Sequence, residues 1–301
     1  MTKEFLCIYH GACDDGFASA WIVRRALGED RVDFYPGVYQ KHPPDITGRN
    51  VIMVDFSYKR PVIDKMRETA NSILILDHHK TAQADLADIL PPISSTTKNY
   101  SIPLELPRMS ALFDMEKCGA SLTWDFFFPD QTRPNFIHYI EDRDLWKKQL
   151  KNGDEFSIAL RSYPQDFKQW DKFILEKNGV GLLISEGQSI QRYYRLRVEE
   201  FKANAYYGEF EMYWDKDQHV NIYEGMFANA PYFAASEVAG ELCNDLTMFG
   251  ACYFHRADGM WQYSLRSRSN FDVSVLAKYY GGGGHANAAG FAVKELVHDR
   301  R

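Results

Sequence analysis

The chain has 301 residues, of which 45% are hydrophobic and 15% aromatic, and its formal net charge is −6. This length favours two domains, and the composition excludes general disorder. The acidic balance excludes a protein that binds long duplex nucleic acid through a basic surface, and no apolar run reaches the roughly 18 residues that span a bilayer.

The N-terminal half alternates between short apolar runs and helix-like stretches. Apolar runs at residues 5–9, 32–35, 51–54 and 73–76 are typical of buried strands, and residues 18–27 and 61–68 have helical spacing. Short, continuously apolar strands that alternate with helices predict an α/β fold, with a parallel sheet covered on both faces.

The middle of the chain carries weaker signals. Four prolines and several Ser and Thr residues at 83–107 indicate an extended loop or insertion. Helical spacing resumes at 120–127 and 136–140, and the charged, periodic stretch 167–202 predicts one or two helices that bridge two domains.

After Gly208 the pattern changes to half-buried strands. Residues 210–214, 220–223, 251–255 and 261–265 alternate or carry aromatic side chains, and a helix is expected at 235–242. This part of the sequence predicts a second, smaller α/β domain. We place the boundary between domains at 195/196.

The cysteines and the N-terminus indicate in which cellular compartment the protein is expected. The five cysteines are widely spaced without a CxxC pair, which argues against disulfides and zinc–thiolate sites, so mostly buried, reduced thiols are expected, with Cys13 as the exception. The first residues run into a strand and do not resemble a signal peptide. We expect a cytoplasmic protein with no membrane partner.

Polar residues follow three of the predicted strands. His10 and an Asp14-Asp15-Gly16 turn follow the first, Asp55 follows the run at 51–54, and Asp77-His78-His79 follows the run at 73–76. Because the carboxyl ends of parallel strands meet at one edge of a sheet, these sets should converge. A single such residue is more often a turn former or a helix cap, but three sets at three strand ends are hard to explain in that way.

The residue types indicate the chemistry of this edge. Imidazole and carboxylate without thiolate suit Mn²⁺, Mg²⁺ or Fe²⁺ better than a structural zinc site. Two such ions roughly 3.5–4 Å apart can activate water and neutralise phosphate oxygens. The sequence therefore predicts a site for two divalent ions that acts on phosphate esters.

A second set of candidate residues lies near the C-terminus. Four consecutive glycines, 281–284, precede His285, and such a costly run favours a loop whose backbone approaches a phosphate closely. Arg266 and Arg268 are expected to point the same way from one strand toward phosphate, although two solvated arginines remain an alternative. Tyr263 and Tyr280 are candidates for stacking on a base, while the other histidines are expected to be structural or exposed.

These motifs also resemble a known family, the DHH/DHHA1 phosphoesterases. The resemblance covers nearly the whole chain, matches residues 83–107 least, and is carried by His10, Asp15-Gly16, Asp55, Asp77-His78-His79, Gly281-Gly282-Gly283-Gly284-His285 and Ala288-Ala289-Gly290-Phe291. The family includes oligoribonucleases, nucleoside bisphosphate phosphatases and cyclic-dinucleotide phosphodiesterases, and more distantly RecJ exonucleases and family II pyrophosphatases. The resemblance implies a DHH catalytic domain at 1–195 and a DHHA1 substrate-binding domain at 196–301.

The resemblance also implies metal ligands. It assigns His10 and Asp55 to a first ion, and Asp15, Asp55, His78 and a later Asp to a second ion, with Asp55 bridging. The later Asp should follow a helical segment in the middle of the chain. We prefer Asp142, which follows the apolar Tyr139-Ile140 pair most closely, and Asp144 is the rival.

Further roles follow for the neighbouring residues. Asp77 is expected to orient a ligand imidazole, and His79 to face the phosphate. The resemblance assigns substrate binding to Arg266 and to the loop formed by Gly282, Gly283, Gly284 and His285.

The sequence departs from the common family pattern before Asp15. Many members carry Asp-x-Asp after the first His, whereas this chain has Cys13 two residues before Asp15 and an extra acid at Asp14. Either Asp14 substitutes through a shifted turn, or the first ion has one ligand fewer. A thiolate ligand at Cys13 is a further alternative.

The expected substrates are short single-stranded oligonucleotides, dinucleotides or nucleoside phosphates, with Mn²⁺ favoured and Mg²⁺ as the second choice. An inorganic polyphosphate or pyrophosphate hydrolase and a non-catalytic nucleotide-binding protein are the alternatives. The sequence leaves the oligomeric state open, a homodimer included.

Overall fold

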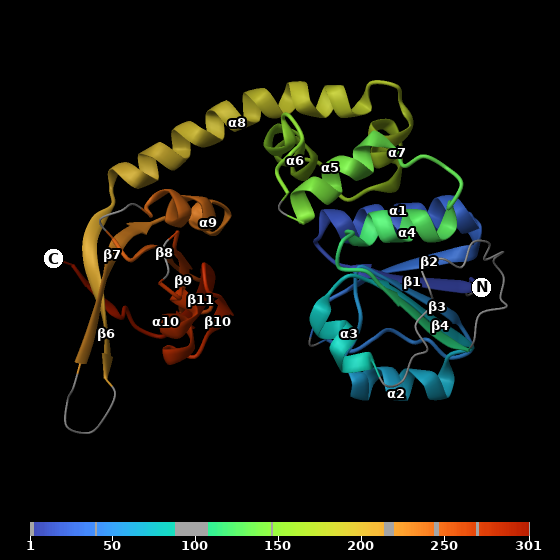
Figure 1. The fold of residues 1–301 in the computed structure, drawn as a ribbon, viewed down its shortest axis with the longest axis horizontal. Coiled ribbons are helices and arrows are strands. Elements are labelled where there is room, and N and C mark those ends of the chain that lie inside the picture. Colours follow the sequence, from blue (N-terminus) through green and yellow to red (C-terminus); the bar gives the residue numbers. More distant parts are fainter. Residues whose placement is uncertain are drawn as a thin grey trace. The chain divides into compact units, whose positions relative to one another are not determined.

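A computed structural model describes residues 3–39, 41–87, 108–145, 147–213, 220–243, 247–268 and 271–300. These residues form two compact units, Met1–Gln191 and Arg192–Arg301, so the division falls inside helix α8 (Gly179–Ala203) (Figure 1). The structure confirms the α/β fold class, because a parallel sheet in the first unit is accompanied by a second, mixed sheet. None of the described helices combines the length and the apolar character needed to cross a membrane.

The first unit is built on a five-stranded sheet in the order β2-β1-β3-β4-β5, and all its strand pairs are parallel. After β1 the chain adds β2 on one side of it, and it then adds β3, β4 and β5 on the other side. The direction in which strands are added therefore reverses between β1 and β3. In an open parallel sheet this reversal leaves a crevice beyond the carboxyl ends of the two strands, where ligands bind. The strands are β1 (Phe5–His10), β2 (Val32–Gly37), β3 (Asn50–Val54), β4 (Ser72–Asp77) and β5 (Met109–Phe113).

Helices cover both faces of this sheet, as the apolar strand runs predict (Figure 1). Side chains of β1 alternate between two cores: Cys7 packs in the core that includes α1 and α4, and Ile8 in the core that includes α2 and α3. The helices of this unit are α1 (Asp14–Leu27), the short 3₁₀ helix η1 (Glu29–Arg31), α2 (Arg60–Thr69), α3 (Lys80–Leu86), α4 (Gly119–Phe127), α5 (Asn135–Asp144), α6 (Gly153–Arg161), α7 (Phe167–Leu175) and the first part of α8.

Two of the sequence predictions for this unit were wrong. The expected turn at residues 14–16 is the first turn of α1, which begins directly after Cys13, and its acids suit the positive end of the helix dipole. The expected loop at 83–107 begins too early, because residues 83–86 belong to α3; the rest of that segment, from 88 onward, lies outside the described residues.

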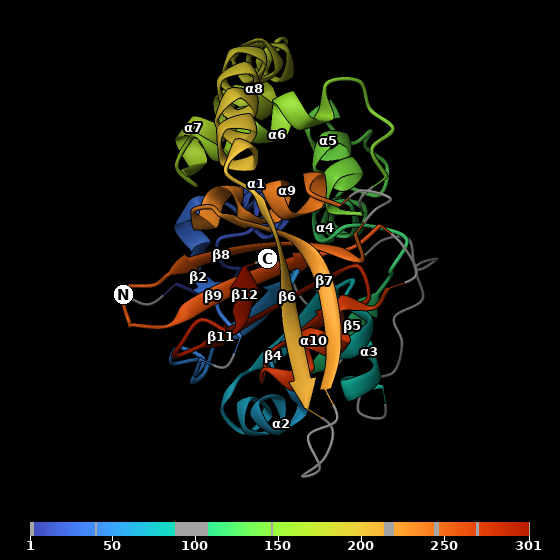
Figure 2. The same cartoon turned by 90° about the vertical axis from the view of Figure 1, so that its left-hand side faces the viewer.

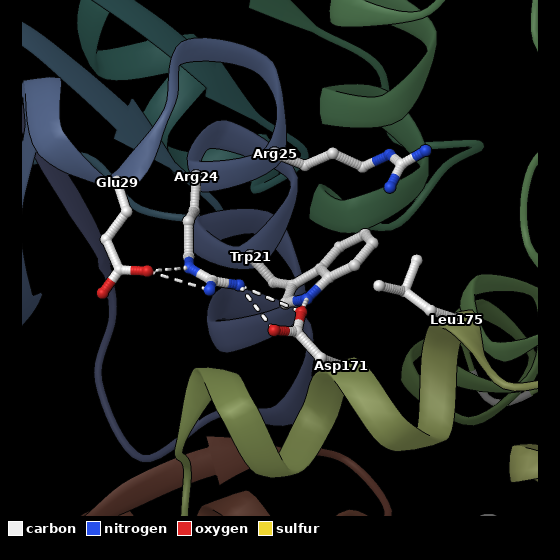
Figure 3. A pocket seen from close by; sticks show the side chains of 6 residues that line it. All are labelled: Trp21, Arg24, Arg25, Glu29, Asp171 and Leu175. Atoms are coloured by element: carbon white, nitrogen blue, oxygen red, sulfur yellow. Dashed lines mark hydrogen bonds and ion pairs between the residues drawn. The ribbon is translucent and has the colours of Figure 1, made fainter.

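Polar contacts join α1 to α7 (Figure 3). Asp171 accepts hydrogen bonds from Trp21 Nε1 at 2.8 Å and from Arg24 at 3.0 and 3.1 Å, and Arg24 also contacts Glu29. These residues, with Arg25 and Leu175, line a pocket of about 250 Å³. Because two carboxylates already neutralise Arg24, we interpret this pocket as a gap between packed helices and not as a binding site.

The second unit contains a mixed sheet in the order β10-β11-β9-β8-β7-β6-β12, in which only the described pair β7–β8 is parallel (Figure 2). One face packs on α10 and the other on α9 and the end of α8. Its elements are β6 (Tyr206–Tyr213), β7 (Val220–Asn229), α9 (Tyr232–Glu241), β8 (Phe249–His255), β9 (Trp261–Arg266), α10 (Val273–Tyr279), β10 (Gly283–His285), β11 (Ala288–Val293) and β12 (His298–Arg300).

Candidate metal centre

Acidic and histidine side chains gather at the carboxyl edge of the parallel sheet. His10 is the last residue of β1, Asp55 directly follows β3, and Asp77 is the last residue of β4, followed by His78 and His79. Asp15 enters from the first turn of α1, and Asp144 from the end of α5. Five elements therefore bring chemically similar side chains to one edge, as the three strand-end sets predict.

The imidazole of His78 lies among three carboxylates. Its Nε2 is 3.0 Å from Asp55 Oδ1, 3.5 Å from Asp144 Oδ2 and 3.7 Å from Asp15 Oδ2. Two ligand atoms about 2.1 Å from one ion are themselves about 3.0–3.4 Å apart at ordinary coordination angles. The 3.0 Å pair lies in this range and the 3.5 and 3.7 Å pairs lie just beyond it, so small shifts would let these side chains hold one divalent cation.

Asp55 stands at the centre of the site. It is 1% exposed, its Oδ1 pairs with His78, and its Oδ2 has no hydrogen-bond partner among the described residues. Nδ1 of His10 lies 3.5 Å from this Oδ2. A buried carboxylate oxygen without a donor is costly, and a cation at this position would satisfy it.

The backbone at Asp55 is also unusual. Its φ is +52°, in the left-handed region that residues other than glycine rarely adopt. Strain of this kind clusters at functional sites, where the surrounding structure holds it in place. It turns the carboxylate into the edge of the sheet immediately after the strand ends.

Two groups of potential ligand atoms share this edge. His10, Cys13 and Asp55 form one, and Asp15, His78 and Asp144 form the other; within each group the ligand atoms lie within 4.8 Å of one another. Asp55, His78 and His79 form a third, overlapping group. Asp55 therefore contacts both sides of the cluster, which is the position that a bridging ligand needs.

The structure favours Asp144 over Asp142, the acid that the sequence analysis preferred. Its carboxylate accepts hydrogen bonds from the backbone N–H groups of Gln149 at 2.8 Å and Leu150 at 3.3 Å, so it shapes the loop after α5. Asp144 is the residue that reaches His78. Helical spacing carries the signal that favours Asp144, because it lies four residues after the buried Ile140 and so on the same face of α5.

Asp77 has a different partner from the one expected. Its Oδ1 lies 2.7 Å from Nδ1 of His79 and also accepts the backbone N–H of His78 at 2.8 Å. The imidazole that Asp77 orients is therefore that of His79, and not that of the candidate ligand His78. The Asp77 contact raises the pKa of His79. A protonated, partly exposed His79 is suited to donating a hydrogen bond to an anion.

The ionisation of the cluster reflects its crowding. Burial raises the pKa of Asp15, and the negative charges of Asp55 and Asp144 raise it further. Burial alone would lower the pKa of His78, but its bond to Asp55 raises it to about 9. Burial and the acids around Cys13 raise the pKa of its thiol. Divalent cations would relieve the repulsion among these acids.

Sequence reasoning missed Gly119, which holds Asp15 in place. The backbone N–H groups of Gly119 and Ala120, in the first turn of α4, donate to the two oxygens of Asp15 at 2.6 and 2.7 Å. A Cβ at position 119 would lie 2.5 Å from Asp55 Cβ and 2.9 Å from Asp15 Oδ2. No sequence signal marks this close approach, because Asp15 and Asp55 are far from Gly119 along the chain.

The predicted substrate-binding residues all lie in the second unit. Arg266 ends β9 and donates to the Ser236 hydroxyl and to the carbonyl of Leu265, and its burial lowers its pKa. Arg268 lies beyond the end of the strand, so the expectation of two arginines on one strand face was wrong. Tyr263 is fully buried and cannot stack on a base.

The glycine run has a structural cause at three of its positions: Gly281 has a φ of +81°, and Gly282 and Gly284 leave no room for a side chain. A Cβ would come within 2.2 Å of the Gly290 carbonyl oxygen at Gly282, and within 2.5 Å of the Ala288 carbonyl oxygen at Gly284. At Gly283 a Cβ would meet nothing within 4 Å, and His285 is exposed. Close packing in the β10–β11 hairpin therefore explains part of the run, and the phosphate-binding role stays a prediction.

Comparison with known proteins decides the family. The family described as the DHHA1 domain matches residues 222–300, which span most of the second unit. The second unit contains a DHHA1 domain. The Asp-His-His sequence at the end of a parallel strand lies in the first unit, outside the matched residues, and the DHHA1 part of the resemblance is confirmed.

One protein resembles this chain in sequence, and several solved structures resemble it in fold. The uncharacterized protein R106 of Acanthamoeba polyphaga mimivirus is 32% identical over 306 residues, which cover 95% of this chain and 66% of that protein, just under two thirds of its length. The pGpG-specific phosphodiesterase PggH from Vibrio cholerae is 14% identical with a TM-score of 0.42, over 97% of this chain and 93% of PggH. RecJ from Thermus thermophilus in complex with Mn²⁺ is 13% identical with a TM-score of 0.46, over 96% of this chain and 49% of RecJ. These two structural likenesses are too distant to indicate an activity.

Proposed function

We propose that this protein is a metal-dependent phosphoester hydrolase that acts on short single-stranded oligonucleotides, dinucleotides or nucleoside phosphates. The observation that carries the proposal is the position of His78 Nε2 among the carboxylates of Asp15, Asp55 and Asp144, beside the unpartnered oxygen of Asp55. The DHHA1 domain at residues 222–300 supports the same reaction class.

The chain itself supplies the ligands and a donor for the phosphate. Asp55 would be shared between two cation positions, with His10 on one side and with Asp15, His78 and Asp144 on the other. Bound Mn²⁺ or Mg²⁺ would activate water and neutralise phosphate oxygens. His79, held by Asp77, would donate a hydrogen bond to the phosphate as negative charge develops.

The charge of the chain limits the substrate. With a net charge of −6, binding to a long polyanion lacks the electrostatic contribution that phosphate contacts supply. Short substrates whose few phosphates sit on the cations avoid this penalty. We assign substrate binding to the second unit, through Arg266, Gly282, Gly283, Gly284 and His285.

A substrate panel tests the proposal. Dinucleotides, short oligoribonucleotides, nucleoside bisphosphates, pyrophosphate and polyphosphate would be incubated with the protein and Mn²⁺, Mg²⁺ or EDTA. We expect hydrolysis of at least one nucleotide ester with Mn²⁺, none with EDTA, and a loss of roughly a hundredfold or more in Asp55→Asn. Asp154→Asn, an exposed acid in the same unit, is the control and should retain activity.

Two results would contradict the proposal. Hydrolysis of pyrophosphate or polyphosphate without any nucleotide ester would assign the protein to inorganic phosphate metabolism. Nucleotide binding without turnover of any substrate would make it a binding protein.

A further inference from the structure

Cys13 lies in the group of potential ligand atoms around Asp55. His10 ends β1, Cys13 immediately precedes α1 and Asp55 follows β3, and the His10 nitrogen, the Cys13 sulfur and the Asp55 oxygen lie within 4.8 Å of one another. A sulfur, a nitrogen and a carboxylate oxygen on three neighbouring segments form a mixed donor set. Such a set suits a cation of intermediate softness.

The unpartnered oxygen of Asp55 indicates independently that a ligand binds at this point. Asp55 is 1% exposed, and its Oδ2 has no hydrogen-bond donor among the described residues, although its Oδ1 is bonded to His78. Nδ1 of His10, a member of the same group as Cys13, lies 3.5 Å from this Oδ2. The position next to His10 and Cys13 is therefore where a positive charge is needed.

The rival acid at this end of α1 is engaged elsewhere. Asp14 pairs with Arg161, whose Nε lies 2.9 Å from its Oδ2, and it belongs to none of the ligand groups among the described residues. Asp14 therefore is not part of the ligand group around Asp55.

The thiol of Cys13 lies at the start of α1. Cys13 occupies the N-cap position without a side-chain capping hydrogen bond of normal geometry, and the nearby backbone N–H of Gly16 favours an ionised sulfur there. The four other cysteines are buried, whereas Cys13 is partly exposed. A partly exposed cysteine within the ligand group of His10 and Asp55 can take part in binding a cation.

We propose that Cys13 binds a divalent cation as a thiolate, together with His10 and Asp55, so that this position prefers Zn²⁺, Co²⁺ or Fe²⁺ over Mg²⁺. The inference rests on the metal centre of the proposed function and names the ligand set of one of its two positions. On binding, the thiol releases its proton to solvent and the sulfur donates an electron pair to the cation. The other position, with Asp15, His78 and Asp144, has only oxygen and nitrogen donors.

Cobalt spectroscopy tests the assignment without an activity assay. The full chain, freed of metal with EDTA and desalted, would be titrated with Co²⁺. Visible d–d bands report that cobalt is bound, and a near-ultraviolet sulfur-to-cobalt charge-transfer band reports a thiolate ligand. We expect both kinds of band in the unchanged protein, and loss of the charge-transfer band in Cys13→Ser while the d–d bands remain.

Two further variants keep the test decisive. Cys118→Ser is the matched control: Cys118 lies beside Asp15 but belongs to none of the ligand groups, and its sulfur accepts the Ser121 N–H at 3.4 Å, a role that a hydroxyl can fill. It should keep the charge-transfer band. Cys13→Asp supplies a harder ligand of similar size, and should lose the band while its affinity for Cd²⁺ relative to Mn²⁺ falls by roughly tenfold or more.

The outcomes separate this inference from the proposed function. Cobalt d–d bands without a charge-transfer band in the unchanged protein would show that Cys13 is not a ligand, and would leave the metal centre intact. A charge-transfer band that survives in Cys13→Asp would assign the thiolate to another cysteine and overturn the inference. Absence of all cobalt bands would overturn both proposals.

Discussion

At the scale of single residues, two acids two positions apart in α5 have opposite roles. Asp144 reaches His78 and is partly exposed, and burial and the charge of Asp55 raise its pKa. Asp142 is buried and accepts two backbone hydrogen bonds. One carboxylate is repelled by its surroundings in the ion-free protein, while the other stabilises the fold.

Alanine substitutions should separate these two roles. We expect Asp144→Ala to lower the affinity for Mn²⁺ by about 10–100-fold without lowering the free energy of unfolding in EDTA. Asp142→Ala should lower that free energy by about 0.5–1.5 kcal/mol, because two part-buried N–H groups lose their acceptor, and should leave Mn²⁺ affinity nearly unchanged. Isothermal titration calorimetry and urea unfolding measure both quantities. Loss of Mn²⁺ affinity in Asp142→Ala alone would restore our first assignment.

The pair of Asp77 and His79 makes a prediction about pH. The bond from His79 to Asp77 raises the pKa of the imidazole, so its protonated form persists to higher pH. If this form donates to the phosphate, activity must decline as pH rises through that pKa. Asp77→Asn removes the charge that favours protonation, so the decline should move to lower pH. The pH dependence of kcat/KM, measured with a substrate found in the panel, checks the direction of the shift.

An unchanged alkaline limb in Asp77→Asn would show that another group controls it. His79→Asn is the companion variant, in which this limb should disappear and the rate should fall by roughly a hundredfold, in the range of general acid–base catalysis. Mn²⁺ affinity, measured separately for both variants, shows whether either imidazole change has disturbed the cations.

At the scale of elements, the first turn of α4 positions the metal ligands. Two of its backbone N–H groups hold Asp15, and Gly119 is so close to Asp55 that no side chain fits. A helix N-terminus favours a negative charge, so it stabilises Asp15 as a carboxylate although burial opposes this. The site therefore depends on a helix that supplies none of its candidate ligand side chains.

Gly119→Ala should damage the metal centre through this helix. The added methyl group meets Asp55 Cβ at 2.5 Å and Asp15 Oδ2 at 2.9 Å, so α4 or the carboxylates must shift. We expect Mn²⁺ affinity to fall about tenfold or more, and the free energy of unfolding to fall by about 1–3 kcal/mol. Calorimetric titration and denaturant unfolding measure the two effects.

Gly240→Ala in α9 is the matched control for this prediction. A Cβ at position 240 meets nothing within 4 Å, so the helix should gain roughly 0.5–1 kcal/mol and Mn²⁺ binding should not change. Unchanged Mn²⁺ affinity in Gly119→Ala would mean that the contact between α4 and Asp15 does not position a ligand.

The sequence predicts strand ends better than it predicts helix faces. Each strand-end set follows an apolar run, so residues such as Asp55 and His78 are recognisable without knowing the packing. The choice between Asp142 and Asp144 depends on which face of α5 turns toward the sheet, and nearness to an apolar pair along the chain does not give that face. Gly119 could not be predicted, because its role comes from contacts with Asp15 and Asp55 that are distant in the sequence.

At the scale of the whole molecule, the order of the strands determines where the ligands meet. Strands β1 and β3 are neighbours in the sheet, and the connections that follow them lead to strands on opposite sides. The ends of these two strands therefore flank one crevice, which His10 and Asp55 face. The apolar pattern predicts the strands and their parallel arrangement, but not the order β2-β1-β3-β4-β5. Convergence of the polar sets follows from parallel strands, and their closeness follows from this order.

The crowded acids should make the stability of the ion-free protein depend on pH. The pKa of His78 is raised from 6.5 to about 9 in the folded protein, so its contribution is complete below pH 6.5 and is lost as pH rises through about 9. The pKa values of Asp15 and Asp144 are also raised, so ionising these acids costs the folded state more than the unfolded state. All three groups make the protein less stable as pH rises, the two acids from about pH 4 upward. The shift of His78 sets the window from pH 6.5 to about 9, in which the protein in EDTA should lose roughly 1–3 kcal/mol.

Mn²⁺ should reverse this trend. A cation competes with the proton on His78 and neutralises the acids, so its binding strengthens as pH rises, and the stability that it adds grows with its affinity. Thermal unfolding measured over this pH range with EDTA and with Mn²⁺ should give two curves that diverge toward high pH. In Asp55→Asn the imidazole of His78 loses its ionised partner and the cations lose their shared ligand, so the two curves should nearly coincide. Parallel curves for the unchanged protein would show that the ions bind away from this cluster.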